Sequence, residues 1–174
     1  MPGDIQSPQH CRSIIDQALK DLGGIDILVN NAAHQARYKS IDEITDQEWE
    51  LTFKVNIHAM FYLSKAAVPH MKPGSAIINT ASINADVPNP KLLAYATTKG
   101  AIQNFTAGLA QLLAEKGIRA NCVAPGPVWT PPMKRPAQPA ELATAYVMLA
   151  DPLSSYTSGA TVAVTGGMSI GAQN

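Results

Sequence analysis

Four short apolar runs alternate with longer amphipathic segments, and this alternation limits most strongly what the chain can fold into. The runs lie at residues 25–29, 76–81, 118–124 and 160–165. Each run is almost continuously apolar, as expected of strands that are buried on both faces. Because the connections are long enough to hold helices, we expect the strands to run parallel, joined by right-handed crossovers.

The segments between the runs carry the spacing of helices. Apolar side chains recur at intervals of three and four residues within 8–22, 46–71, 92–115 and 139–150. Ser7 is a candidate N-cap for the first helix, and Thr45 with Glu48 has the spacing of a capping box before the second. The sequence therefore predicts an α/β fold, a doubly wound parallel sheet with helices on both faces, in a single domain over 1–174.

Composition excludes several classes of protein. A chain of 174 residues that is 46% hydrophobic fits one domain with one sizeable core. We expect no membrane span, because no run approaches about 18 apolar residues, and no signal peptide. The 13 basic and 13 acidic residues balance, which indicates neither nucleic acid nor an anionic membrane as a partner. Cys11, Cys122 and the four histidines lack metal-ligand spacing, so we expect no metal and a reducing, cytoplasmic location.

Three residues in the middle of the chain have the chemistry of a proton-transfer site. Ser82 directly follows the second apolar run, and Tyr95 and Lys99 are four residues apart within the third helix, hence on one face. An ammonium beside a phenol favours the phenolate, which would make Tyr95 a usable acid and base near neutral pH. Ligands of parallel sheets bind past the carboxyl ends of the strands, where Ser82 is expected to lie.

Each of these residues also has an ordinary structural interpretation. Tyr95 alone would more often be a half-buried core tyrosine, and Ser82 alone could cap a turn. Asn56 lies on the apolar stripe of the second helix, where a buried amide needs partners. It therefore marks either a functional water site or a satisfied core amide.

Taken together, the motifs resemble the short-chain dehydrogenase/reductase family in order and spacing over nearly the whole chain. They are Asn30-Asn31-Ala32-Ala33, Asn56, Ser82 thirteen residues before Tyr95, the Tyr95…Lys99 pair, and Pro125-Gly126…Thr130. The resemblance implies a partial Rossmann-like fold. It also implies an NAD- or NADP-dependent oxidoreductase that transfers hydride between nicotinamide and a secondary alcohol or carbonyl.

The resemblance also implies a role for each residue. Tyr95 would exchange a proton with the substrate oxygen and Ser82 would hydrogen-bond that oxygen. Lys99 would hold the nicotinamide ribose and lower the pKa of Tyr95, while Asn56 would hold a relay water. The implied cofactor contacts are Asp4 at the adenine, Asn31 and Ala32 on the adenosine side, Val128 and Thr130 at the carboxamide, and Pro125, Gly126, Tyr95 and Lys99.

The chain departs from the family pattern in two places. It contains no Gly-x-x-x-Gly-x-Gly run, and the segment after Pro131 is short. Without the glycine-rich turn and its helix, we expect weak dinucleotide binding, with NAD and NADP not distinguishable. The strand at 25–29 becomes an edge that could pair with another chain, giving a homo-oligomer or a complex with a full-length relative. A truncated, non-catalytic association partner and an unstable fragment are the alternatives.

Overall fold

The computed structural model describes residues 2–128 and 137–168, and these contain one four-stranded sheet. The strand order is β1-β2-β3-β4 and every pairing is parallel. The strands are β1 (Ile27–Asn30), β2 (Ala76–Thr80), β3 (Arg119–Pro125) and β4 (Thr161–Val164). The predicted parallel α/β sheet is confirmed, although β1 begins two residues later than expected and includes Asn30.

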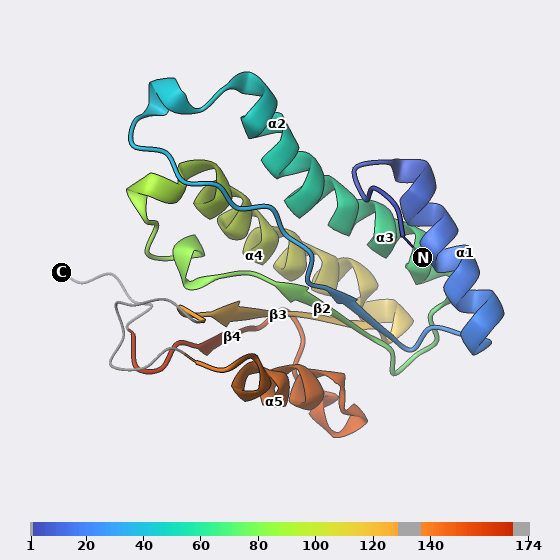
Figure 1. The fold of residues 1–174 in the computed structure, drawn as a ribbon. Coiled ribbons are helices and arrows are strands. Elements are labelled where there is room, and N and C mark those ends of the chain that lie inside the picture. The colour runs from blue at the N-terminus through green and yellow to red at the C-terminus, as the bar shows by residue number, and fades with distance from the viewer. Residues whose placement is uncertain (1, 129–136, 169–174) are drawn as a thin grey trace.

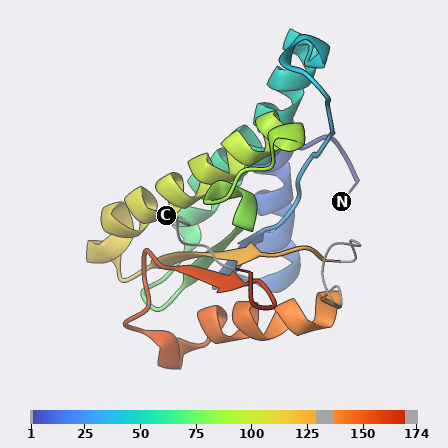
Figure 2. The same cartoon turned by 90° about the vertical axis from the view of Figure 1, so that its left-hand side faces the viewer.

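Helices cover both faces of the sheet, as predicted. α1 (Pro8–Leu22), α3 (Ala59–Ala67) and α4 (Leu93–Leu113) lie on one side, and α5 (Pro139–Ala150) lies on the other (Figures 1 and 2). On the α5 side, the core consists of Ile78, Val123, Ala145 and Leu149 with their neighbours. On the opposite side, two clusters fill the space beneath α1, α3 and α4, with Ile77, Ala120, Met60 and Ile102 among their members.

The first two helix caps form largely as expected. The Ser7 side chain accepts from His10 N at 3.2 Å, and Gly23 ends α1 with a left-handed φ of 77°. Thr45 Oγ1 accepts from Glu48 N at 3.1 Å, which caps α2 (Asp46–Phe53). The predicted reciprocal bond of the capping box, from Thr45 N to the Glu48 carboxylate, does not form. The carboxylate instead accepts from His34 Nε2 at 2.8 Å and from Thr52 Oγ1 at 3.2 Å.

The single helix predicted over 46–71 is divided in the structure. A π-helical turn, Lys54–His58, separates α2 from α3, and within it Ala59 N–H bonds to Lys54 O, five residues back. α3 ends at Ala67 and a 3₁₀ turn, Val68–His70, follows. Pro69 lacks an N–H and its ring clashes with the preceding turn, so the α-helix cannot continue. π-turns of this kind occur frequently at functional sites, and this one contains Asn56.

β1 is an edge of the described sheet, as predicted. It pairs with β2 alone, and its outward side chains Ile27 and Val29 are 50% and 46% exposed. Buried parallel strands do not normally show such exposure.

Candidate active site

Ser82 and Tyr95 converge at the carboxyl end of β2. Ser82 follows the strand by two residues and caps a 3₁₀ turn, Ile83–Ala85, where its Oγ accepts from Asn84 N at 3.1 Å. Tyr95 lies in the first turn of α4. Burial raises the pKa of Tyr95, and a hydrogen bond with the Ser82 side chain offsets part of that rise. Both side chains line the same cleft at this strand end.

Lys99 lies one turn after Tyr95 and is only 1% exposed. Its Nζ donates to Thr80 O at 2.6 Å and lies 5.2 Å from the centroid of the Tyr95 ring. Burial lowers the pKa of Lys99 to about 8, because desolvation disfavours the ammonium. Within residues 2–128 and 137–168, no carboxylate forms an ion pair with this ammonium.

The expectation that Lys99 lowers the pKa of Tyr95 is wrong for this structure. The pKa of Tyr95 is raised by burial, and only Ser82 acts against that rise. The cause is desolvation, because the buried phenol would lose the hydration that a phenolate needs. Tyr95 is therefore a neutral phenol at neutral pH, which is the form that donates a proton.

A cleft of about 660 Å³ opens past the carboxyl ends of the strands. It brings together six of the predicted site residues: Asn31, Ser82, Tyr95, Pro125, Gly126 and Val128. Thr80, Gln35, Asn84 and Asn89 add polar groups, and Arg37 is the one charged residue among the described residues that line it. The cleft lies where ligands of parallel sheets bind.

The packing of the backbone requires a glycine at position 126, in addition to the cofactor contact predicted there. A Cβ at this position would lie 2.9 Å from the Cα and the carbonyl oxygen of Thr165, just past β4. Only a glycine lets these two backbones approach so closely. The last predicted cofactor contact, Thr130, lies outside the described residues.

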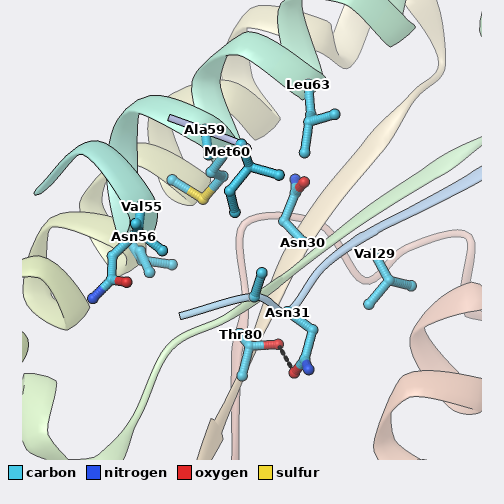
Figure 3. A pocket seen from close by; sticks show the side chains of 12 residues that line it. Val29, Asn30, Asn31, Val55, Asn56, Ala59, Met60, Leu63 and Thr80 are labelled. Carbon is cyan, nitrogen blue, oxygen red and sulfur yellow. Dashed lines mark hydrogen bonds between the residues drawn. The ribbon is translucent and has the colours of Figure 1, made fainter. Parts of the chain in front are cut away.

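A smaller cavity of about 90 Å³ lies between the end of β1 and the π-turn (Figure 3). Ala32 and Ile5 line it, and Asn31 and Thr80 line both this cavity and the cleft. Asn30 also lines it, and its Oδ1 is buried without a hydrogen-bond partner among the described residues. The side chain of Asp4, the residue before Ile5, accepts from Gln6 N at 2.9 Å.

The Asn56 amide is fully engaged by protein groups. Its Oδ1 accepts from His34 N at 2.7 Å, and its Nδ2 donates to His34 O and Thr98 Oγ1, each at 3.0 Å. The side chain thus fixes the loop that follows β1 to the helix face. A relay water at Asn56 stays a prediction, and it would need an atom other than this satisfied amide.

Two residues near the cleft were missed by the sequence analysis. Thr80 Oγ1 donates to Asn31 Oδ1 at 2.9 Å and lies 2.7 Å from the hydroxyl of Tyr146 on α5. The position of Thr80, two residues before Ser82, could have suggested a role. Tyr146 gave no signal, because only the packing of α5 beneath the sheet brings it to the strand end.

These features define a Rossmann-like α/β protein with a serine, a tyrosine and a lysine grouped at the carboxyl edge of its sheet. The family model described as short chain dehydrogenase matches residues 1–141, and the chain belongs to that family.

Named relatives agree with this assignment. The chain is 47% identical to General stress protein 39 of Bacillus subtilis (strain 168) over 183 residues, covering 95% of this chain and 64% of that protein. It is 46% identical to Glucose and ribitol dehydrogenase of Daucus carota over 182 residues, covering 94% of this chain and 62% of that protein. The chain thus spans less than two thirds of the length of these relatives.

A solved structure shows the same fold. The 3-ketoacyl-(acyl-carrier-protein) reductase from Brucella melitensis, complexed with NADH, superposes with a TM-score of 0.90 at 30% identity. The match covers 95% of this chain and 76% of that one. In the part of the chain that the structure describes, no helix combines the length and apolar character needed to cross a bilayer.

Proposed function

We propose that this protein transfers hydride between a nicotinamide cofactor, NAD or NADP, and the carbon of a secondary alcohol or carbonyl compound. One observation carries the proposal: Ser82 and Tyr95 line the same cleft, with the buried Lys99 one turn further along α4. Membership of the dehydrogenase family and the NADH complex of a structural neighbour support it.

The residues present fit such a cofactor. An ammonium has three donors, yet Lys99 Nζ donates to Thr80 O alone among the described residues, so donors remain for ribose hydroxyls. Asn31 and Ala32 would contact the adenosine side and Asp4 the adenine, with Pro125, Gly126, Val128 and Thr130 at the nicotinamide end. The unpartnered Asn30 Oδ1 in the adjoining cavity is a further acceptor. When bound, the nicotinamide supplies or accepts the hydride.

The protein's own residues move the proton. In carbonyl reduction, the Ser82 hydroxyl hydrogen-bonds the substrate oxygen, and the Tyr95 phenol gives its proton to that oxygen as the carbon becomes an alcohol. A phenol is a stronger acid than an alcohol, so this transfer is favourable even with the raised pKa of Tyr95. The phenolate left on Tyr95 then takes up a proton from solvent, and alcohol oxidation reverses the steps. A relay water held at Asn56 would have to bind an atom of that residue other than its side-chain amide.

Affinity for the cofactor is expected to be weak. The 174 residues contain no glycine-rich turn opening a helix, which is the main pyrophosphate site of this architecture. We therefore expect dissociation constants in the millimolar range.

The test combines binding with turnover. NADH and NADPH are titrated into the millimolar range while tryptophan fluorescence and Tm are recorded, and aldehydes and ketones are then screened for oxidation of the reduced nucleotide. Tyr95→Phe keeps the ring and removes the hydroxyl group that carries the exchangeable proton. We expect turnover to fall at least about 100-fold with little change in cofactor affinity.

Tyr156→Phe is the matched control, because Tyr156 is fully exposed. Its turnover should equal that of the wild type. A wild-type chain that binds neither nucleotide contradicts the proposal, and so does a Tyr95→Phe variant that retains full turnover.

A second candidate, a non-catalytic association partner, is favoured by one observation. The β1 edge presents the half-exposed apolar side chains Ile27 and Val29. This alternative would be supported by a chain that binds no nucleotide, has no turnover of its own and assembles with a full-length relative.

A further inference from the structure

A chain of hydrogen bonds runs from α5 to the turn after β1, and Thr80 is its centre. The Tyr146 hydroxyl lies 2.7 Å from Thr80 Oγ1, which lies 2.9 Å from Asn31 Oδ1 (the second contact is drawn in Figure 3). The carbonyl of the same threonine accepts from Lys99 Nζ at 2.6 Å. One residue thus joins α5, α4 and the end of β1.

The chemistry of the groups fixes the direction of these bonds. An amide oxygen can only accept, so Thr80 must donate its single hydroxyl proton to Asn31 Oδ1. Thr80 Oγ1 can then only accept at its other contact, and Tyr146 is the donor. With its Oδ1 turned to Thr80, the Asn31 amide keeps Nδ2 without a partner among the described residues. That donor remains for a ligand in the cleft or in the smaller cavity.

We propose that Tyr146 is a positioning residue for cofactor binding. Through Thr80, its hydroxyl holds the Asn31 amide in one orientation and anchors the strand end whose carbonyl holds Lys99. The proposal rests on the proposed function, which assigns cofactor contacts to Asn31 and Lys99. Tyr146 lines neither of the two cavities described above, so it acts through Thr80 and does not contact the ligand there.

Loss of the Tyr146 hydroxyl would release this arrangement. Tyr146 is only partly exposed, and burial raises its pKa, so its hydroxyl is a neutral donor at neutral pH. Without that donor, the Thr80 hydroxyl can rotate to other acceptors, and the Asn31 amide loses its fixed partner. The cofactor would then have to order both groups when it binds, which lowers its affinity.

The test is a double-mutant cycle in the full chain with Tyr146→Phe and Thr80→Val, both nearly isosteric. The dissociation constant of NADH or NADPH is measured by tryptophan fluorescence, with kcat and KM for a substrate found in the screen. We expect each single variant to weaken cofactor binding about three- to tenfold, and Tyr146→Phe to change kcat at saturating cofactor by less than about twofold. The double variant should bind no more weakly than Thr80→Val, because both changes break one chain of bonds.

Two further variants separate positioning from general damage. Thr80→Ser keeps the hydroxyl and should restore binding to near the wild-type value, while Tyr156→Phe on the exposed surface should have no effect. Wild-type affinity in Tyr146→Phe, or additive effects in the double variant, would overturn this inference alone. A wild-type chain that binds no nucleotide would overturn the proposed function and this inference together.

Discussion

At the scale of single residues, burial shifts the pKa of each central side chain of the site in the direction that favours its neutral form. It raises the pKa of Tyr95 and lowers that of Lys99 from 10.5 to about 8. For Lys99, this shift corresponds to a bias of about 3 kcal/mol against the charged form. The ammonium thus persists at neutral pH at a cost to stability, as expected of a functional group held in place by the surrounding fold.

The titration of Lys99 should be visible in the stability of the protein. Between about pH 8 and 10.5, the folded lysine has lost its proton while the unfolded lysine keeps it, so this group increases the free energy of unfolding as pH rises. We expect the free energy of unfolding of the wild type minus that of Lys99→Met to rise by about 2–3 kcal/mol across this window. Urea unfolding at a series of pH values measures it.

The difference between the two proteins is needed because other groups titrate nearby. Burial raises the pKa of the Cys11 and Cys122 thiols, and this makes stability fall as pH rises above about 9. That contribution is largely shared by wild type and Lys99→Met and cancels. If the free energy of unfolding of the wild type minus that of Lys99→Met did not change with pH, the lowered pKa of the buried Lys99 would be contradicted.

At the scale of elements, the π-turn between α2 and α3 determines how the loop after β1 is held. It carries Asn56, whose amide bonds to both backbone groups of His34 and to Thr98. The Glu48 carboxylate holds the ring of His34 from α2. The helix therefore fixes the start of the loop whose next residues, Gln35 and Arg37, line the cleft.

Asn56→Ala should destabilise the protein strongly. It removes three hydrogen bonds and leaves the backbone N–H and C=O of His34 without their Asn56 partners. We expect the free energy of unfolding to fall by about 2–4 kcal/mol. Thermal and urea unfolding measure this, with Asn104→Ala, at an exposed amide on α4, as the control. A loss no larger than that of the control would show that the amide is not structural.

At the scale of the whole molecule, the sheet is covered unevenly. The core of the α5 side is built from β2, β3, β4 and α5. β1 has one neighbouring strand, and Ile27 and Val29 remain about half exposed. An apolar strand with an unpaired edge is a template for another chain.

This edge should promote association. We expect the mass of the wild type, measured by light scattering after gel filtration, to increase with concentration, and Ile27→Lys to reduce that increase by charging the strand. Leu153→Lys is the control, because Leu153 is also a large apolar residue, is 91% exposed and lies in the 3₁₀ turn Pro152–Ser154, not in a strand. A wild type that stays monomeric at every concentration would refute the prediction.

The sequence by itself determined the order of the strands and of the helical segments, and it proposed Ser82, Tyr95 and Lys99 as one site. Apolar periodicity identified the four strands and the helical segments, although it did not reveal the π-turn that divides 46–71. Ser82 follows a predicted strand, and the spacing of Tyr95 and Lys99 puts them on one helix face. These features are local or depend on a single rule, that the carboxyl ends of parallel strands share an edge. They could therefore be read along the chain.

Only the tertiary structure decided the electrostatics and the polar connections. Lys99 was expected to lower the pKa of Tyr95, but packing places its ammonium over the ring and against Thr80 O, and burial dominates. In the Tyr146–Thr80–Asn31 chain, Thr80 is 49 positions from Asn31 and 66 positions from Tyr146 in the sequence. Desolvation and long-range hydrogen bonds depend on which groups are brought together in space, which no local pattern of residues encodes.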